Sequence, residues 1–206
     1  MNEDIRDSFI EFFNNFVKYA KVLNELTLKR FEHKEISFAS KEMLSFIVCE
    51  CLIEDMTIID ELKENGHSRR YVDSIIRNMC EQVIEYKYIM KYQDLLKEYF
   101  GQNLSENWEG TNLFKGLKRT GEARFKDRKT VAEMARSIDE YKSNDEKSSL
   151  YDIYSLKAEY EHHSYFHYLF ELINKNDGDE TADDLDYVFM IYVLSSFEKT
   201  YIDVLK

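Results

Sequence analysis

The chain contains no proline among its 206 residues, although proteins use about 5% proline on average. Because proline breaks a helix in its interior, this absence permits long uninterrupted helices. Cysteine is also scarce. The three cysteines, Cys49, Cys51 and Cys80, lie in apolar stretches and lack the spacing of a metal site. We therefore expect buried thiols in a reducing compartment.

Long apolar runs are missing as well. The acidic N-terminus, Met1–Arg6, is not followed by ~18 consecutive apolar residues, so we expect neither a signal peptide nor a membrane span. We predict a cytoplasmic protein. The 28 basic and 40 acidic residues give a net charge of -12, which argues against broad electrostatic attraction to nucleic acid or to anionic membranes.

Several motifs that identify enzyme classes do not occur. The sequence has no phosphate-cradling glycine motif, no Gly-x-Ser-x-Gly elbow and no Cys-x-x-Cys pair. Four of the six glycines fall between residues 101 and 121. We expect residues 1–206 to form a single helical domain, with an irregular glycine-rich and basic segment at about 101–129.

The chain is rich in apolar residues spaced three or four apart, which is the periodicity of helices with one buried face. The 44% apolar residues and 15% aromatic residues suffice for a sizeable core. The expected helices span about 4–32, 40–64, 69–100, 130–141, 149–174 and 182–204. The predicted core faces of the first and last helices include Tyr19, Leu26, Leu185 and Val188. The fold class is therefore all-α, an antiparallel bundle of about five long helices and one short helix.

Arg77-x-x-x-Glu81 is the first group of residues with chemical potential. Side chains four apart lie on one helix face, and this pair borders an apolar stripe. It forms either an exposed ion pair or part of a buried pocket in which Arg77 holds an anion and Glu81 orients a partner.

The segment 151–167 concentrates three of the five histidines. Imidazole suits proton transfer and metal binding near neutral pH. Glu159-x-x-His162 has the spacing of carboxylate-bridged di-metal bundles, and His163 and His167 are spaced to share one metal ion. The sequence assigns no metal ligand and no cofactor, because the further ligands of a di-metal site are not specified. A histidine-rich polar helix edge is the alternative.

Residues 115–129 hold seven basic and two acidic side chains, a local exception in an acidic protein. With Phe114, Phe125 and Trp108 nearby, this segment would grip phosphate or stack on the bases of RNA. The alternative is a solvated loop that pairs with the acidic surface.

Four motifs occur together in the order Arg77-x-x-x-Glu81, Trp108, Tyr151-x-x-Tyr-Ser and His162-x-Ser164. This arrangement, over roughly residues 40–170, resembles a group of bacterial all-helical domains of unknown function, which join an Arg/Glu helix to a later Tyr…His-x-Ser helix. The resemblance implies one buried polar cluster between these helices, made of Arg77, Glu81, Tyr151, His162 and Ser164. The chain departs from the pattern at Ala158, where the family has serine, and at His163, where it has proline.

A helical nuclease superfamily is similar in fold class, but its signature is an arginine followed four to six residues later by a histidine. The closest pair here, Arg30-x-x-His33, is too short.

Three functions remain open. The first is a cytosolic binding module for a partner protein or a small anionic ligand, in which Tyr151 and Ser164 contact the ligand. The second is a hydrolase, for example of a phosphodiester, in which His162 is the acid/base, Glu81 orients it and Arg77 stabilises negative charge. The third is a metal-binding bundle. The aromatic faces also leave room for a homodimer.

Overall fold

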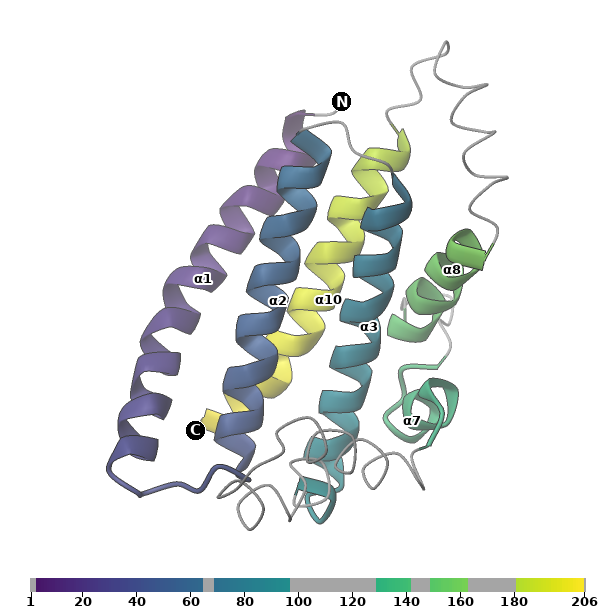
Figure 1. Ribbon diagram of the computed structural model, residues 1–206. Helices are drawn as coiled ribbons and strands as arrows, with labels where there is room; N and C mark the ends of the chain where they lie inside the picture. The colour runs from purple at the N-terminus through teal and green to yellow at the C-terminus, as the bar shows by residue number, and fades with distance from the viewer. Residues whose placement is uncertain (1–2, 65–68, 97–128, 142–148, 163–180, 206) are drawn as a thin grey trace, which may run out of the picture.

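The computed structural model describes residues 3–64, 69–96, 129–141, 149–162 and 181–205 (Figure 1). Within these ranges every regular element is a helix, which confirms the all-α class. The helices are α1 (Glu3–Glu32), α2 (Lys41–Glu64), α3 (Arg69–Lys91), α7 (Val131–Ser137), α8 (Leu150–His162) and α10 (Thr181–Leu205).

Three helix starts follow from side chains that satisfy free backbone N–H groups. Ser40 accepts a hydrogen bond from the Met43 amide (3.2 Å) ahead of α2. Ser149 accepts one from the Asp152 amide (3.2 Å) ahead of α8. Thr130 and Glu133 form a capping box at the start of α7.

One helix end differs from the prediction. The apolar periodicity extends helix 69–100 to Gly101, whereas α3 ends at Lys91. After it, Leu95 and Leu96 donate backbone hydrogen bonds to residues only three positions earlier, the tighter pattern of a turn. The rest of that helix and the predicted part of the fifth helix beyond His162 lie outside the described residues.

Contacts between side chains give the direction of α1 relative to two neighbours. Arg6 pairs with Glu64 (2.6 Å), and Asn24 donates to Glu50 (2.6 Å), so α1 and α2 run antiparallel. Asn24 also accepts a hydrogen bond from Tyr201 (2.7 Å), near the far end of α10. Since Phe9 near the start of α1 packs on a ring near the start of α10, those two helices run in the same direction (Figure 1).

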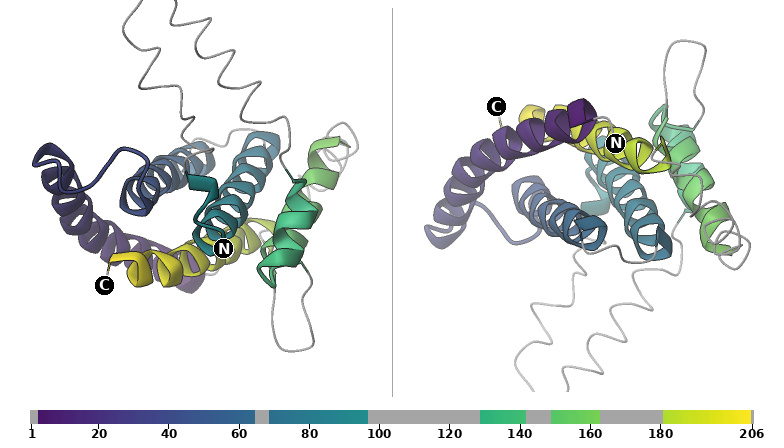
Figure 2. Two further views of the ribbon diagram at one scale, coloured as in Figure 1. Left: turned by 90° about the horizontal axis from the view of Figure 1, so that it is seen from below. Right: turned by 90° about the horizontal axis from the view of Figure 1, so that it is seen from above.

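Helix α3 is the centre of the fold and packs against α2, α7, α8 and α10. In Figures 1 and 2, α7 and α8 form one edge of the molecule and α1 forms the opposite edge. The core between these edges is apolar and aromatic; Phe197, for example, lies against the rings of Phe16, Tyr86 and Tyr201.

Four residues assigned to the core by periodicity are exposed instead. They are Tyr19 (44% exposed), Leu26 (51%), Leu185 (50%) and Val188 (44%). Apolar side chains occur on more than one face of α1 and α10, and packing buries the face that includes Phe16 on α1 and Tyr187 on α10. The remaining apolar face of α1 therefore meets solvent.

Candidate functional site

A tight turn after α7 aims the next side chains back at the bundle. Asp139 adopts a left-handed backbone (φ 60°), which aspartate tolerates better than most residues. The amide of Glu140 then donates to the carbonyl of Ala135 (2.9 Å). As a result, the Glu140 side chain is buried while Tyr141 lies at the surface edge.

Glu140 joins four helices. Its carboxylate accepts hydrogen bonds from Lys87 of α3, from Ser196 of α10 (3.3 Å) and from the first amide of α8, Leu150 (3.2 Å). Its backbone carbonyl accepts from the amide of Tyr151 (3.1 Å). Glu140 therefore sets the start of α8 relative to α7 and α3.

A second buried polar cluster secures the middle of α8. The Lys157 ammonium group donates to Asp73 of α3 (2.5 Å) and to Asp186 of α10 (2.7 Å). Asp186 also accepts from Lys63 of α2 (3.1 Å). All three side chains are at most 1% exposed: Lys157, Asp73 and Asp186. Because water cannot solvate these charges, each is stabilised by the opposite charge and the hydrogen bonds of its partners.

The contacts of Glu140 and of Lys157, which we call the two anchors of α8, hold three tyrosines in a stacked row. The rings of Tyr141 and Tyr151 lie 4.8 Å apart at 28°, and those of Tyr151 and Tyr154 lie 5.7 Å apart at 27°. An arginine covers each end: Arg136 is 3.9 Å from the Tyr141 ring, and Arg77 is 5.7 Å from the Tyr154 ring. We call these five residues the aromatic ladder. Its tyrosines are half-buried and Arg136 is exposed, so one side of the ladder meets solvent.

The structure locates the predicted site residues only in part. Arg77 and Tyr151 both belong to the aromatic ladder. Glu81 lies on α3, half-buried, one turn beyond Arg77. His162 is the last residue of α8, and its side chain, like Ser164, lies outside the described residues.

The two helices paired by the family resemblance do pack together, as α3 and α8. Among the described residues, a buried polar contact between these two helices joins Asp73 and Lys157, which sequence reasoning did not select. A local signal was present: Asp73 shares the spacing of Ile76 and Cys80, and Lys157 that of Ile153. A charged residue at a core position requires a partner.

The cysteines are poor nucleophiles. Burial raises the pKa of Cys49 to about 12 and also raises the pKa of Cys80. Cys51 is half-exposed, contrary to the prediction that all three thiols are buried. Its pKa is raised by partial burial and by the nearby Asp55, Glu54 and Glu50 carboxylates, so the thiolate is disfavoured here too.

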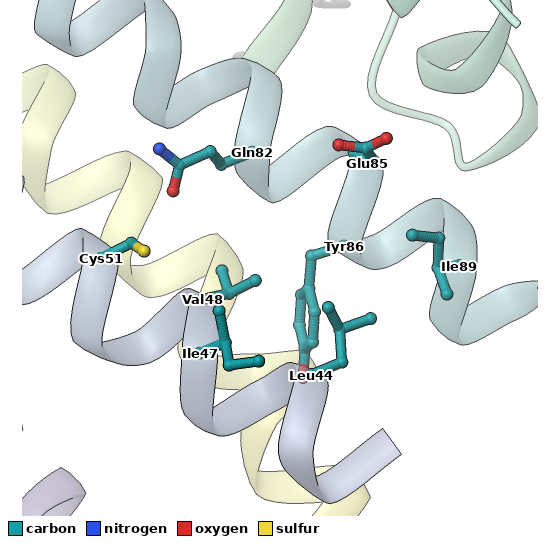
Figure 3. Close-up of a pocket in the computed structure, with 8 residues that line it drawn as sticks. All are labelled: Leu44, Ile47, Val48, Cys51, Gln82, Glu85, Tyr86 and Ile89. Carbon is teal, nitrogen blue, oxygen red and sulfur yellow. The ribbon is translucent and has the colours of Figure 1, made fainter. Parts of the chain in front are cut away.

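Figure 3 shows a hollow of about 90 Å³ between α2 and α3. Apolar residues of α2 form its floor, and Gln82 and Glu85 of α3 form its polar rim. The volume is far below the roughly 300–1,000 Å³ of sites for small organic ligands. It has room for a few waters rather than for a nucleotide.

Asp55 beside this hollow makes stability depend on pH. Burial, opposed by a hydrogen bond from Gln82 (3.3 Å), raises the pKa of Asp55 to about 6. The folded state thus holds the Asp55 proton more tightly than the unfolded chain does. Protonated Asp55 therefore stabilises the fold fully in acid, and this contribution to the free energy of unfolding is lost as pH rises through about 6. Asp55→Asn should therefore raise the urea midpoint at about pH 8 and change it little at about pH 4. The exposed Asp94→Asn is the control, and equal shifts at both pH values would contradict the assignment.

Comparisons with family models, with curated proteins and with solved structures found no match to this chain. In the part of the chain that the structure describes, no helix is long and apolar enough to cross a bilayer. Among the same residues, no three His, Cys, Asp or Glu side chains gather closely enough to hold a metal ion. The His162 side chain lies outside the described residues, so the metal-binding alternative stays a prediction.

Proposed function

We propose that the protein is a cytosolic helical-bundle binding module without catalytic activity, and that the aromatic ladder is the surface on which it holds a partner protein. The observation that carries this proposal is the continuous stack from Arg136 through Tyr141, Tyr151 and Tyr154 to Arg77.

The composition of the ladder supports a protein partner. Tyrosine and arginine are the residues that dominate binding energy at protein interfaces. Tyrosine offers a large contact area at a low cost in conformational entropy, because it has only two side-chain torsions. Stacking on neighbours lowers that cost further, since the rings of Tyr151 and Tyr154 are already ordered before binding.

The chemistry of the ladder also indicates what the partner offers. Ring edges carry partial positive charge, tyrosine hydroxyls donate hydrogen bonds, and Arg77 and Arg136 add a guanidinium at each end. Guanidinium groups bind carboxylates through paired hydrogen bonds. We therefore propose that the partner presents an extended acidic segment.

We also propose that the bundle is mainly antiparallel, as α1 and α2 are, with the pair α1 and α10 running in the same direction. Helices α7 and α8 rest on α3, and the anchors at Glu140 and Lys157 keep the ladder rigid. A rigid, preorganised surface suits recognition without chemistry.

The test begins with peptides selected from a randomised acidic library on the wild-type chain. The expected result is that Tyr151→Ala lowers their affinity by about 2 kcal/mol, or roughly thirtyfold in Kd, as for an interface hot spot. Fluorescence anisotropy with a labelled peptide measures this loss. Tyr71→Ala removes a tyrosine that is 61% exposed on α3 and lies outside the ladder, so it is the matched control.

Two outcomes would overturn the proposal. Selected peptides that bind the Tyr151→Ala variant as tightly as the wild type would remove the ladder from recognition. Hydrolysis of a model phosphodiester by the wild type but not by His162→Gln would instead establish the hydrolase, with Glu81 and Arg77 as its supporting groups.

A further inference from the structure

The hollow between α2 and α3 has an apolar floor and a rim that carries acidic groups (Figure 3). Glu85 of α3 lies on this rim. On the α2 side, partial burial raises the pKa of Cys51, and the nearby Asp55, Glu54 and Glu50 carboxylates raise it further. These carboxylates act on a thiol that itself lines the hollow. Acidic groups therefore border the hollow on both helices.

The basic residues of α2 and α3 do not balance this charge. Those along the helices contact other elements: Lys63 meets Asp186, Lys87 meets Glu140, Lys91 meets the Ser137 carbonyl, and Arg77 covers the Tyr154 ring. The others occupy the helix starts, at Lys41, Arg69 and Arg70. Lys41 lies one turn before Leu44 at one end of the hollow, about 20 Å along the axis of α2 from Glu54.

The lysines in the middle of α1 lie on the other side of α2. Figure 1 shows α1 and α3 on opposite sides of α2, and Lys18 and Lys21 are exposed on α1. Glu50 faces α1, from which it accepts a hydrogen bond (2.6 Å). Glu54 is exposed and Glu85 is half-buried, so both can meet a group that approaches the hollow from solvent.

The volume of the hollow fits one aliphatic side chain. Its roughly 90 Å³ corresponds to about three water molecules at about 30 Å³ each, whereas a cavity that holds a benzene ring measures about 150 Å³. Leu44, Ile47 and Val48 line the hollow and offer apolar surface to a side chain that fills it. The hollow therefore suits leucine or valine better than an aromatic ring.

We propose that this hollow is a docking site for a partner protein that presents one aliphatic side chain flanked by lysine or arginine. The aliphatic side chain fills the hollow, and the basic neighbours meet Glu85 on one side and Glu54 on the other. The net charge of -12 favours the approach of a basic segment. This inference does not depend on the aromatic ladder, which lies on the opposite side of α3 from α2 (Figure 1).

Other occupants fit the hollow less well. Nucleic acid and anionic membranes carry the same sign of charge as its rim. A polyamine matches the charge but has no branched aliphatic group to bury against the apolar floor. The chain's own basic segment 115–129 lies outside the described residues, and the experiment below includes it as a competitor.

A short peptide series tests the aliphatic anchor on the full chain. The probes are labelled peptides of the form Lys-Lys-X-Lys-Lys, with leucine, serine or tryptophan at X, and fluorescence anisotropy measures their Kd. The leucine peptide should bind about tenfold more tightly than the serine peptide, because leucine buries apolar surface in the hollow. The tryptophan peptide should bind more weakly than the leucine peptide, since its ring exceeds the volume available.

Variants of the chain test the rim and the hollow separately. Glu54→Lys should weaken binding of the leucine peptide about fivefold, as for an exposed ion pair. Glu11→Lys, an equal change of charge at an exposed position on α1, is the control and should weaken it less than twofold. Cys51→Leu extends an aliphatic group into the hollow and should abolish the preference for leucine over serine, whereas Cys51→Ser should keep it.

The proposal is overturned if the leucine and serine peptides bind equally, or if Glu54→Lys has no more effect than Glu11→Lys, because charge alone would then explain binding. It is also overturned if spermine binds as tightly as the leucine peptide and displaces it. A tenfold gain in peptide affinity on changing Arg124→Gln/Lys126→Gln would show that the chain's own segment occupies the hollow, which also contradicts an external partner.

Discussion

Replacing Lys157 with methionine should lower the free energy of unfolding by about 3–5 kcal/mol, the cost of removing one partner from a buried ion pair. Methionine fills a similar volume but offers no charge and no hydrogen-bond donor. Asp73 and Asp186 would then lose the ammonium group that both contact, at 2.5 Å and 2.7 Å, while shielded from water. Urea denaturation at neutral pH measures the loss. Lys199→Met, on the exposed side of α10, is the matched control and should stay near wild type.

A second variant separates charge from packing. In the triple variant Lys157→Met/Asp73→Leu/Asp186→Leu no carboxylate remains in the cluster, and buried ion pairs replaced by apolar side chains are often neutral or stabilising. The triple variant should therefore recover most of the stability that Lys157→Met loses. Lys63 loses its contact with Asp186 in the triple variant, but its side chain is 9% exposed and keeps access to water. A triple variant as unstable as the single one would show that the cluster contributes through packing rather than through charge balance.

The fold class and the helix starts could be predicted because their causes are local. The reciprocal contacts of Thr130 and Glu133 depend on residues three apart in the sequence. The contact from Ser40 to the start of α2 is of the same kind. Helical spacing of apolar residues is likewise a property of one segment at a time.

The buried face of each helix could not be predicted in this way. Helix α10 carries apolar residues around most of its circumference, so spacing alone did not separate Val188 from Tyr187. Packing decides between them. Tyr187 lies against Phe9 and donates to Asp60 (3.3 Å), whereas Val188 is 44% exposed. These partners are distant in the sequence.

Helical spacing was also insufficient to predict which residues form the candidate site. Arg77 and Tyr151 were selected from the sequence, and both lie in the ladder, but Tyr141 and Arg136 were not. The place of Tyr141 follows from the left-handed Asp139, which turns the chain after α7, and Arg136 in α7 then lies over the Tyr141 ring. The backbone conformation of this one residue, Asp139, therefore determines that Tyr141 stacks on Tyr151, and the helical spacing of apolar residues does not predict it.

Glu140→Ala should be the second most damaging change, with an expected loss of about 2–4 kcal/mol in the free energy of unfolding. Alanine leaves the Lys87 ammonium with one fewer anion and the Leu150 amide without its acceptor, in a place that is 3% exposed in the wild type. Burial and the nearby Glu140 carboxylate also raise the pKa of Tyr192 to about 12, so Tyr192 should titrate at lower pH in the variant. Urea denaturation gives the stability change, and ultraviolet difference spectra of the tyrosines follow the titration.

The substitution Glu140→Ala should also disturb the packing of the aromatic ladder. Glu140 connects the turn that carries Tyr141 to the first turn of α8, which carries Tyr151. Near-ultraviolet circular dichroism of the tyrosines should therefore weaken at denaturant concentrations where the helices remain folded. Glu140→Gln retains an acceptor for the Leu150 amide and should lose less than Glu140→Ala, since only the charge opposite Lys87 is removed. Glu159→Ala, which removes an exposed carboxylate from α8 itself, is the control. If Glu140→Ala were no less stable than this control and kept the wild-type dichroism, Glu140 would not position the ladder, and the rigidity on which recognition depends would have to come from the cluster around Lys157.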